Sequence, residues 1–155
     1  MKKIIYPIFI CLISLFALTG CLTKKQITTK QFIDIVEKEN YQIVDVKKQF
    51  EQEDSIKEAT IAINEDREYQ LEFYKLSSNK AANAMYLKNK EIFDEDTKNE
   101  NKSTLNKDLF NYSSYQITTK DKFKYLCKVN STFLYVNVDK KYQSEVEKTI
   151  KNLGY

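Results

Sequence analysis

Two alternating runs near the C-terminus constrain the fold of this chain more than any other feature. Over 122–129 and 132–138, side chains of two kinds alternate, which is typical of strands with two distinct faces. Asn130-Ser131 between them fits a two-residue hairpin turn. That turn would pair Val129 with Thr132, Cys127 with Leu134, and Tyr125 with Val136. Because all these partners fall on one face, the register predicts an antiparallel hairpin with a buried side.

Further strands and three helices are predicted around this hairpin. Strand-like runs lie at 41–46, 56–63, 68–76 and 112–118. Apolar stripes and capping signals predict helices over 29–39, from Ser77 or Ser78 to about Phe93, and from Asp139 to a stop at Gly154. The first helix starts with a capping box, formed by Thr28 and Gln31. The polar stretch 94–108 is predicted to be the longest loop.

The order of these elements is helix, three strands, helix, three strands, helix. It predicts an α+β fold with an antiparallel sheet of about six strands. The sheet would be built from two strand-strand-strand-helix units preceded by an N-terminal helix. We expect the helices to lie mainly on one face of the sheet.

The N-terminus has the pattern of an export signal. Lys2 and Lys3 precede an apolar run over 4–18, which is short for a helix that spans a membrane. The run ends at Leu18-Thr19-Gly20-Cys21, where small residues come directly before a cysteine. This ending favours a cleavage site over a permanent membrane anchor.

Leu18-Thr19-Gly20-Cys21 resembles the lipobox of bacterial lipoproteins, and the chain is similar in general pattern to small, uncharacterised lipoproteins of Gram-positive bacteria. The resemblance implies cleavage between Gly20 and Cys21 and a diacylglycerol on the Cys21 thiol. The expected organisation is a signal peptide at 1–20, a lipidated cysteine with a short tether at 21–26, and a single extracytoplasmic α+β domain at 27–155. The domain would stand on the outer face of the cytoplasmic membrane. An ordinary secretory signal or an uncleaved anchor is the alternative.

Cleavage would leave the chain almost neutral. The full sequence has 25 basic and 22 acidic residues, and removal of Lys2 and Lys3 leaves 23 against 22, a net charge of +1. Arg67 is the single arginine of the sequence, so almost no side chain can bind phosphates or bases through two parallel hydrogen bonds. We therefore expect no nucleic-acid partner.

The composition excludes several kinds of catalytic site. The sequence has no histidine, which removes Ser-His-Asp and Cys-His catalysis and imidazole zinc sites. Of the three cysteines, Cys11 lies in the signal, Cys21 is the expected lipid site, and Cys127 is predicted to be an inert thiol in the core. Asp94 and Asp96 match the first positions of a calcium loop, but Asn99 stands where that loop needs glycine. No catalytic residue, metal or cofactor is expected beyond the diacylglycerol on Cys21.

The outer face of the last hairpin is the candidate binding face. It carries three large side chains between two lysines, namely Lys124, Leu126, Lys128, Phe133 and Tyr135. If the helices cover the opposite face, this surface is exposed, and such patches mark binding sites. Alternatively, cross-strand aromatic pairs stabilise the sheet here, or a helix or loop covers them.

These observations predict a membrane-anchored extracytoplasmic lipoprotein that acts as a non-catalytic binding or accessory module. Its expected partners are the membrane, through the lipid anchor, and an envelope protein or glycan. Two alternatives stay open, a small cell-envelope hydrolase that uses carboxylates and an immunity or inhibitor lipoprotein. Two or more acids in one pocket would favour the hydrolase, whereas a sheet face with exposed aromatic residues would favour the binding module.

Overall fold

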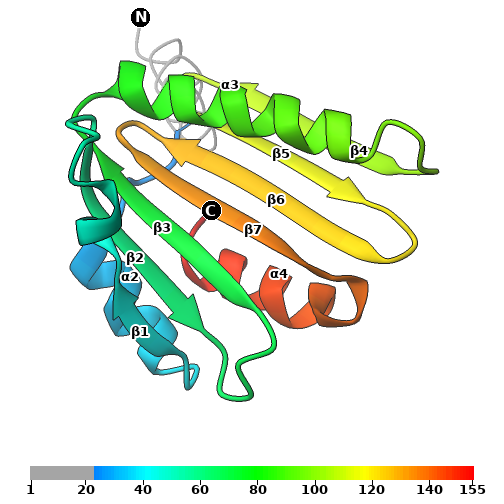
Figure 1. The fold of residues 1–155 in the computed structure, drawn as a ribbon, viewed down its shortest axis with the longest axis horizontal. Helices are drawn as coiled ribbons and strands as arrows, with labels where there is room; N and C mark the ends of the chain where they lie inside the picture. Colours follow the sequence, from blue (N-terminus) through cyan, green and yellow to red (C-terminus); the bar gives the residue numbers. More distant parts are fainter. Residues whose placement is uncertain (1–22) are drawn as a thin grey trace, which may run out of the picture.

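The fold is an antiparallel sheet with helices on both of its faces. The computed structural model describes residues 23–155, which contain seven strands in the order β1-β2-β3-β7-β6-β5-β4 (Figure 1). The strands are β1 (Gln42–Asp45), β2 (Ile56–Ile63), β3 (Gln70–Leu76), β4 (Ser103–Leu109), β5 (Tyr112–Thr118), β6 (Lys122–Val129) and β7 (Thr132–Asp139). The α+β class and the antiparallel sheet are confirmed, with one strand more than the six expected.

Three α-helices are present in the described part of the chain, and each begins near a predicted start. They are α2 (Thr29–Glu37), α3 (Asn79–Asp96) and α4 (Gln143–Asn152), with 3-10 turns η2 (Lys47–Phe50) and η3 (Lys140–Tyr142). The capping box of α2 is confirmed, since the Gln31 backbone N–H donates to Thr28 Oγ1 and the Thr28 backbone N–H donates to Gln31 Oε1. Ser78 caps α3 through the backbone N–H of Ala81.

The register of the C-terminal hairpin is confirmed. Strands β6 and β7 pair Val129 with Thr132, Cys127 with Leu134, and Tyr125 with Val136. The turn between them places Asn130 at φ 50°, a conformation that asparagine tolerates better than most residues. Strand β7 then pairs with β3, which joins the two halves of the sheet.

The prediction of a long loop over 94–108 is wrong. Helix α3 continues to Asp96, and β4 occupies most of the remaining stretch as an edge strand paired with β5. Its residues from Ser103 to Asp108 are all exposed. Neither face of β4 is buried along this length, so the strand has no apolar alternation by which a sequence pattern could reveal it. Backbone pairing with β5 is what holds it in place.

Asp139 does not cap the last helix as the sequence predicted. Its side chain makes no capping hydrogen bond, and the turn η3 intervenes before α4 begins. The carboxylate instead accepts a hydrogen bond from Lys122 Nζ at 2.7 Å across the β6–β7 pair. The predicted stop at Gly154 agrees with its φ of 79°, which lies in the left-handed region that glycine favours.

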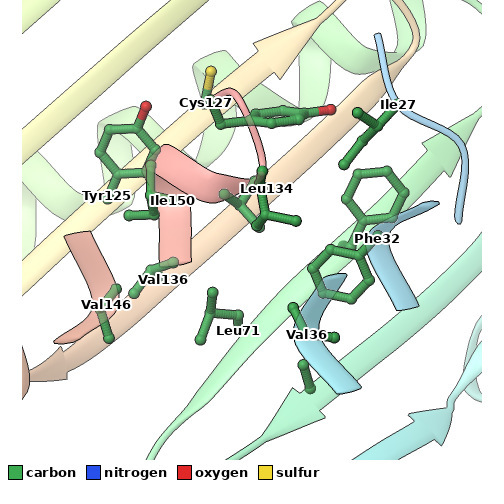
Figure 2. Packing of buried hydrophobic residues seen from close by; sticks show 14 of the residues in the cluster. Ile27, Phe32, Val36, Leu71, Tyr125, Cys127, Leu134, Val136, Val146 and Ile150 are labelled. Carbon is green, nitrogen blue, oxygen red and sulfur yellow. The ribbon is translucent and has the colours of Figure 1, made fainter. Parts of the chain in front are cut away.

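One face of the sheet, which we call the closed face, packs against α2 and α4. Figure 2 shows side chains from both helices meeting alternate residues of the strands β3, β6 and β7. Phe32 of α2 stacks on Phe73 of β3 with 4.7 Å between ring centroids. Cys127 is fully buried among these residues, and burial raises the pKa of its thiol to about 11. The prediction that Cys127 lies in the core is thus confirmed, and a buried thiol of this kind is expected to react slowly.

The opposite face, which we call the α3 face, carries a second core. Ala82, Tyr86 and Phe93 of α3 belong to this core together with Ile117, Leu126 and Phe133 of the sheet. Figure 1 shows α3 along the side of the sheet that holds β5 and β6, away from β1 and β2. The helix therefore covers only part of its face.

The N-terminal part of the sequence prediction lies outside the described residues. The signal peptide at 1–20, the Leu18-Thr19-Gly20-Cys21 motif and the cleavage site before Cys21 fall there. Within residues 23–155, no helix combines the length and the apolar character that a membrane crossing needs. The predicted tether at 21–26 is described from Thr23 on, and Lys24 and Gln26 both hydrogen-bond to the domain.

Candidate functional site

The candidate binding face is not an exposed surface, and the alternative left open by the sequence, that a helix covers it, is confirmed. Helix α3 lies on it, so Leu126 is 0% and Phe133 is 1% exposed, and Lys124 is 5% exposed. Only Lys128 and Tyr135 stay half-buried. The physical reason is that α3 packs opposite to α2 and α4, so the apolar side chains on the outer side of the hairpin form the second core.

Lys124 serves to hold α3 in place. Its Nζ lies 2.9 Å from Asp96 Oδ2 in the last turn of the helix and 4.8 Å from the ring centroid of Phe93. The neighbouring Asp94 accepts hydrogen bonds from the Tyr115 hydroxyl and from Lys90 Nζ. The two acids that matched the start of a calcium loop are thus engaged with lysines and a tyrosine at the end of α3.

The electrostatics of Asp94 follow from these partners. Partial burial pushes the pKa of its carboxyl upward, and hydrogen bonds from Tyr115 and Lys90 act against it. The positive charges of Lys90 and Lys102 add to the same effect, so the pKa of Asp94 is lower than usual. Asp94 is therefore a charged anchor for α3.

A groove opens beside α3, where the helix leaves the sheet uncovered. Its volume is about 540 Å³, enough for several side chains of a ligand. Its floor comes from β3 and β7, which contribute Glu72, Tyr74, Phe133 and Tyr135. Glu72 pairs directly with Tyr135 and Tyr74 with Phe133 in the register of the two strands. Because side chains alternate along a strand, both pairs point to the α3 face.

The walls of the groove come from segments far apart in sequence. The turn η2 and the residues after it contribute Phe50 and Glu53, and α3 contributes Met85, Lys88 and Ile92. Phe50 meets Tyr74 edge-on with 5.8 Å between ring centroids. The Tyr74 ring in turn lies 6.1 Å from that of Phe133. An aromatic row therefore crosses the groove from its wall to its floor.

A hydrogen-bonded carboxylate lies in the floor. The Tyr74 hydroxyl donates to Glu72 Oε2 at 2.6 Å, and Gln70 Nε2 donates to Glu72 Oε1 at 2.9 Å. Burial raises the pKa of Tyr74, and the hydrogen bond to Glu72 and the charges of Glu72 and Glu53 raise it further. Tyr74 is therefore a protonated donor at neutral pH. Its two neighbouring carboxylates make this part of the groove attractive to cations.

Tyr135 marks the point where the groove continues along the strands. It is half-buried, and its ring lies 5.2 Å from that of Phe93, which fixes it against α3. Burial raises the pKa of Tyr135. A second hollow of about 460 Å³ shares Glu72 and Tyr135 with the first and extends to Gln70 and Asn137. An extended ligand could therefore follow the β3–β7 pair across both hollows.

The arrangement suits binding of an apolar ligand that carries a positive charge. Tyrosine faces attract cations, and Glu53 and Glu72 supply negative charge beside them. Within residues 23–155 no group of three or more acids or cysteines is placed to hold a metal ion. Cys127 lies on the closed face, away from the groove.

Of the predicted site residues, only Phe133 and Tyr135 line the groove. Sequence reasoning missed Phe50, Glu53, Glu72, Tyr74 and the α3 residues of the wall. One signal was present, because Glu72 and Tyr74 are the members of the third predicted strand that alternate with buried Leu71 and Phe73. The sequence pattern does not show which helix leaves that face open.

Comparison with known proteins gives no relative from which a function could be transferred. No protein family, no curated protein and no solved structure matches the chain. The chemistry of the groove and the N-terminal motif are therefore the two indications of a function.

Proposed function

We propose that this chain is a lipid-anchored extracytoplasmic binding module. In this proposal the chain is cleaved between Gly20 and Cys21, the Cys21 thiol carries a diacylglycerol, and the groove beside α3 binds an envelope ligand. The observation that carries the binding function is the aromatic and acidic floor of the groove. The membrane location is supported by the motif Leu18-Thr19-Gly20-Cys21 behind a charged and then apolar N-terminus. Two acyl chains hold a protein on a bilayer far better than one.

The ligand best suited to this groove is a segment of an envelope protein with a basic side chain among apolar ones. The half-buried Tyr135 offers aromatic surface, and Glu72 is held between donors that fix its position. Glu53 adds a second negative charge at the wall, and Lys88 is the basic residue on the lining. A glycan, the other partner that the sequence suggested, would use the aromatic surface but has no need of the negative charge.

Binding can be tested with peptides of opposite charge. The lipidated full chain in detergent is titrated with an amphipathic Lys-Leu peptide, its Glu-Leu counterpart and a soluble peptidoglycan fragment. We expect binding of the Lys-Leu peptide and a loss of about tenfold in affinity for Tyr135→Ala, the scale of one partly desolvated cation–π contact. The matched control is Leu87→Ala, which changes an exposed side chain of α3 outside the groove lining.

Two outcomes would contradict this ligand class. Equal binding of both peptides would show that the groove does not select for positive charge. Binding of the peptidoglycan fragment alone, abolished by Tyr135→Ala, would replace the peptide by a glycan.

The anchor is tested by mass analysis of the mature N-terminus. We expect a diacylglyceryl modification on Cys21 and loss of membrane association in Cys21→Ser. A mature chain that starts elsewhere with an unmodified residue would contradict the proposal.

A second candidate function is hydrolysis by carboxylates, because Glu53 and Glu72 line the same groove. General acid catalysis needs a proton held at neutral pH, usually by burial, whereas Glu53 is exposed to water. Both oxygens of Glu72 already accept hydrogen bonds. The test is to incubate the protein with cell-wall material and to measure soluble products. A hydrolase would release products, and both Glu53→Gln and Glu72→Gln would lose this activity. If wild-type protein releases nothing, the binding function stands alone.

A further inference from the structure

The start of the described chain is fastened to one end of the sheet. The backbone N–H of Lys24 donates to Asn111 Oδ1 at 3.0 Å, and Asn111 Nδ2 donates back to the Lys24 carbonyl at 2.7 Å. The Lys24 ammonium donates to the Gly154 carbonyl and lies 5.1 Å from the ring centroid of Tyr112. These four contacts fix the position of Lys24 against the domain.

This attachment limits where a lipid on Cys21 can be. Cys21 precedes Lys24 by three residues, and an extended chain spans at most about 3.6 Å per residue, so their Cα atoms lie within about 11 Å. Asn111, the partner of Lys24, belongs to the turn between β4 and β5. A lipid-bearing Cys21 therefore brings that turn close to the bilayer surface.

The same turn carries the most exposed large apolar side chain in residues 23–155. Phe110 is 84% exposed, against 54% for Leu87, the next in order. A single exposed apolar residue is ordinary on a protein surface. The position of Phe110 is what matters here, since it adjoins the residue that holds the start of the chain.

Lysines surround this end of the molecule. Lys25 and Lys107 are exposed, and Asp108 is the acid nearest to the turn in β4. Burial lowers the pKa of Lys24, and the positive charge of Lys107 lowers it further. Lysines at a membrane surface are attracted to anionic headgroups.

We infer that the β4–β5 turn is the membrane-contacting end of the domain, with Phe110 in the interfacial layer of a lipid bilayer and the lysines at its headgroups. This inference rests on the proposed lipid anchor at Cys21. The observations that carry it are the bonds from Lys24 to Asn111 and the exposure of Phe110 beside them. In Figure 1 the end of β4 and the start of β7 lie at the same end of the sheet as the start of the described chain.

The absence of tryptophan from the sequence allows a direct test. Phe110→Trp introduces a single fluorescent probe at an exposed site, where little packing is lost. The lipidated full chain is reconstituted into phosphatidylglycerol vesicles that contain a spin-labelled quencher lipid. The matched control is Lys120→Trp, at the exposed turn between β5 and β6, one strand length away. We expect a blue-shifted emission and loss of fluorescence at position 110, with neither change at position 120.

The outcomes separate this inference from the proposed anchor. If the Phe110→Trp chain floats with the vesicles and carries the acyl modification but its fluorescence is not quenched, the anchor stands and the inference is overturned. Equal quenching at positions 110 and 120 also overturns it, because the domain then has no preferred contacting end. A chain that lacks the acyl group and does not float contradicts the anchor itself. Quenching that weakens in phosphatidylcholine vesicles, or in Lys25→Gln/Lys107→Gln, supports the contribution of the lysines.

Discussion

The two faces of the sheet are covered in different ways. Two helices, α2 and α4, bury the closed face against alternate residues of β3, β6 and β7. One helix, α3, covers only part of the other face and is held in part by ion pairs such as Lys124–Asp96. The closed face is a continuous apolar core. The α3 face carries the groove and its hydrogen-bonded Glu72.

Simple dimensions explain this difference. Seven strands spaced about 4.8 Å apart span about 29 Å, whereas a helix with its side chains is about 10 Å wide. A single helix therefore cannot cover its face of the sheet, and part of β2, β3 and β7 stays open beside it. Strand β7 contributes to both faces, because Leu134 lies on the closed face and Tyr135 lines the groove. The groove is the part of this face that α3 does not cover.

The largest expected difference between the faces is in the cost of truncating a side chain. Leu71 of β3 is fully buried on the closed face, and Ile61 of β2 is half-buried on the α3 face. We expect Leu71→Ala to lower the free energy of unfolding by about 2–5 kcal/mol, because it removes buried surface and leaves a cavity. Ile61→Ala should cost about 1 kcal/mol, since much of its surface already contacts water.

Urea unfolding of both variants measures these costs, with the exposed Val44→Ala as a control near zero. Equal losses for Leu71→Ala and Ile61→Ala would mean that the open part of the α3 face is as tightly packed as the closed face.

The next effect concerns the ion pair that holds α3. The Lys124 side chain is 6% exposed and that of Asp96 is 52% exposed. Asp96→Asn leaves a buried ammonium without its charged partner, which should lower the free energy of unfolding by about 2 kcal/mol. Lys124→Met leaves Asp96 in contact with water and places an apolar chain over Phe93, so it should cost less than about 1 kcal/mol.

The order of these two variants is the test, and chemical denaturation measures it. If Lys124→Met were the more damaging, the lysine would contribute by its charge to a wider network than the pair with Asp96.

Features set by short-range chemistry could be predicted from the sequence. The hairpin register followed from alternation on both sides of Asn130-Ser131. The caps of α2 and α3 followed from a threonine or serine directly before a helical apolar stripe. Burial of Cys127 followed from the same register. These features depend on neighbours within a few residues or on one paired strand, so a local pattern is sufficient evidence.

The groove could not be predicted, because it depends on which face α3 covers. Along α3, apolar residues are found on more than one side, so Leu87 and Ile92 are exposed while Ala82 and Phe93 are buried. A helix of this kind can pack on either face as far as its sequence shows. The same ambiguity made the outer side of the hairpin look exposed. The strand β4 was missed for another reason, because its exposed residues show no apolar alternation.

Removal of the caps of α2 and α3 is expected to cost less stability than the changes above, and by similar amounts for the two faces. Thr28 caps α2 on the closed face with reciprocal bonds to Gln31, and Ser78 caps α3 with one bond to the Ala81 backbone. Each change to alanine should lower the free energy of unfolding by about 1 kcal/mol, with the larger loss for Thr28→Ala. Thermal unfolding measures both, and Ser77→Ala serves as the neighbouring control. A larger loss for Ser78→Ala would show that α3 depends on its cap more than α2 does.

The smallest expected effect is a loosening of α3 in acid. The pKa of Asp94 is lower in the folded chain than the ordinary value of about 3.9, which we take for the unfolded chain. Its charge therefore contributes stability that is fully present above about pH 4 and is lost as the pH falls through the lowered folded pKa. Because Asp94 is partly exposed, we expect Asp94→Asn to cost under about 1 kcal/mol at pH 6. The difference from wild type should shrink as the pH falls through the lowered folded pKa, because the wild-type carboxyl then becomes neutral too. Unfolding in urea over a series of decreasing pH values measures it. Since asparagine can still accept the hydrogen bond from Tyr115, a difference that persists in acid would assign the effect to geometry rather than charge.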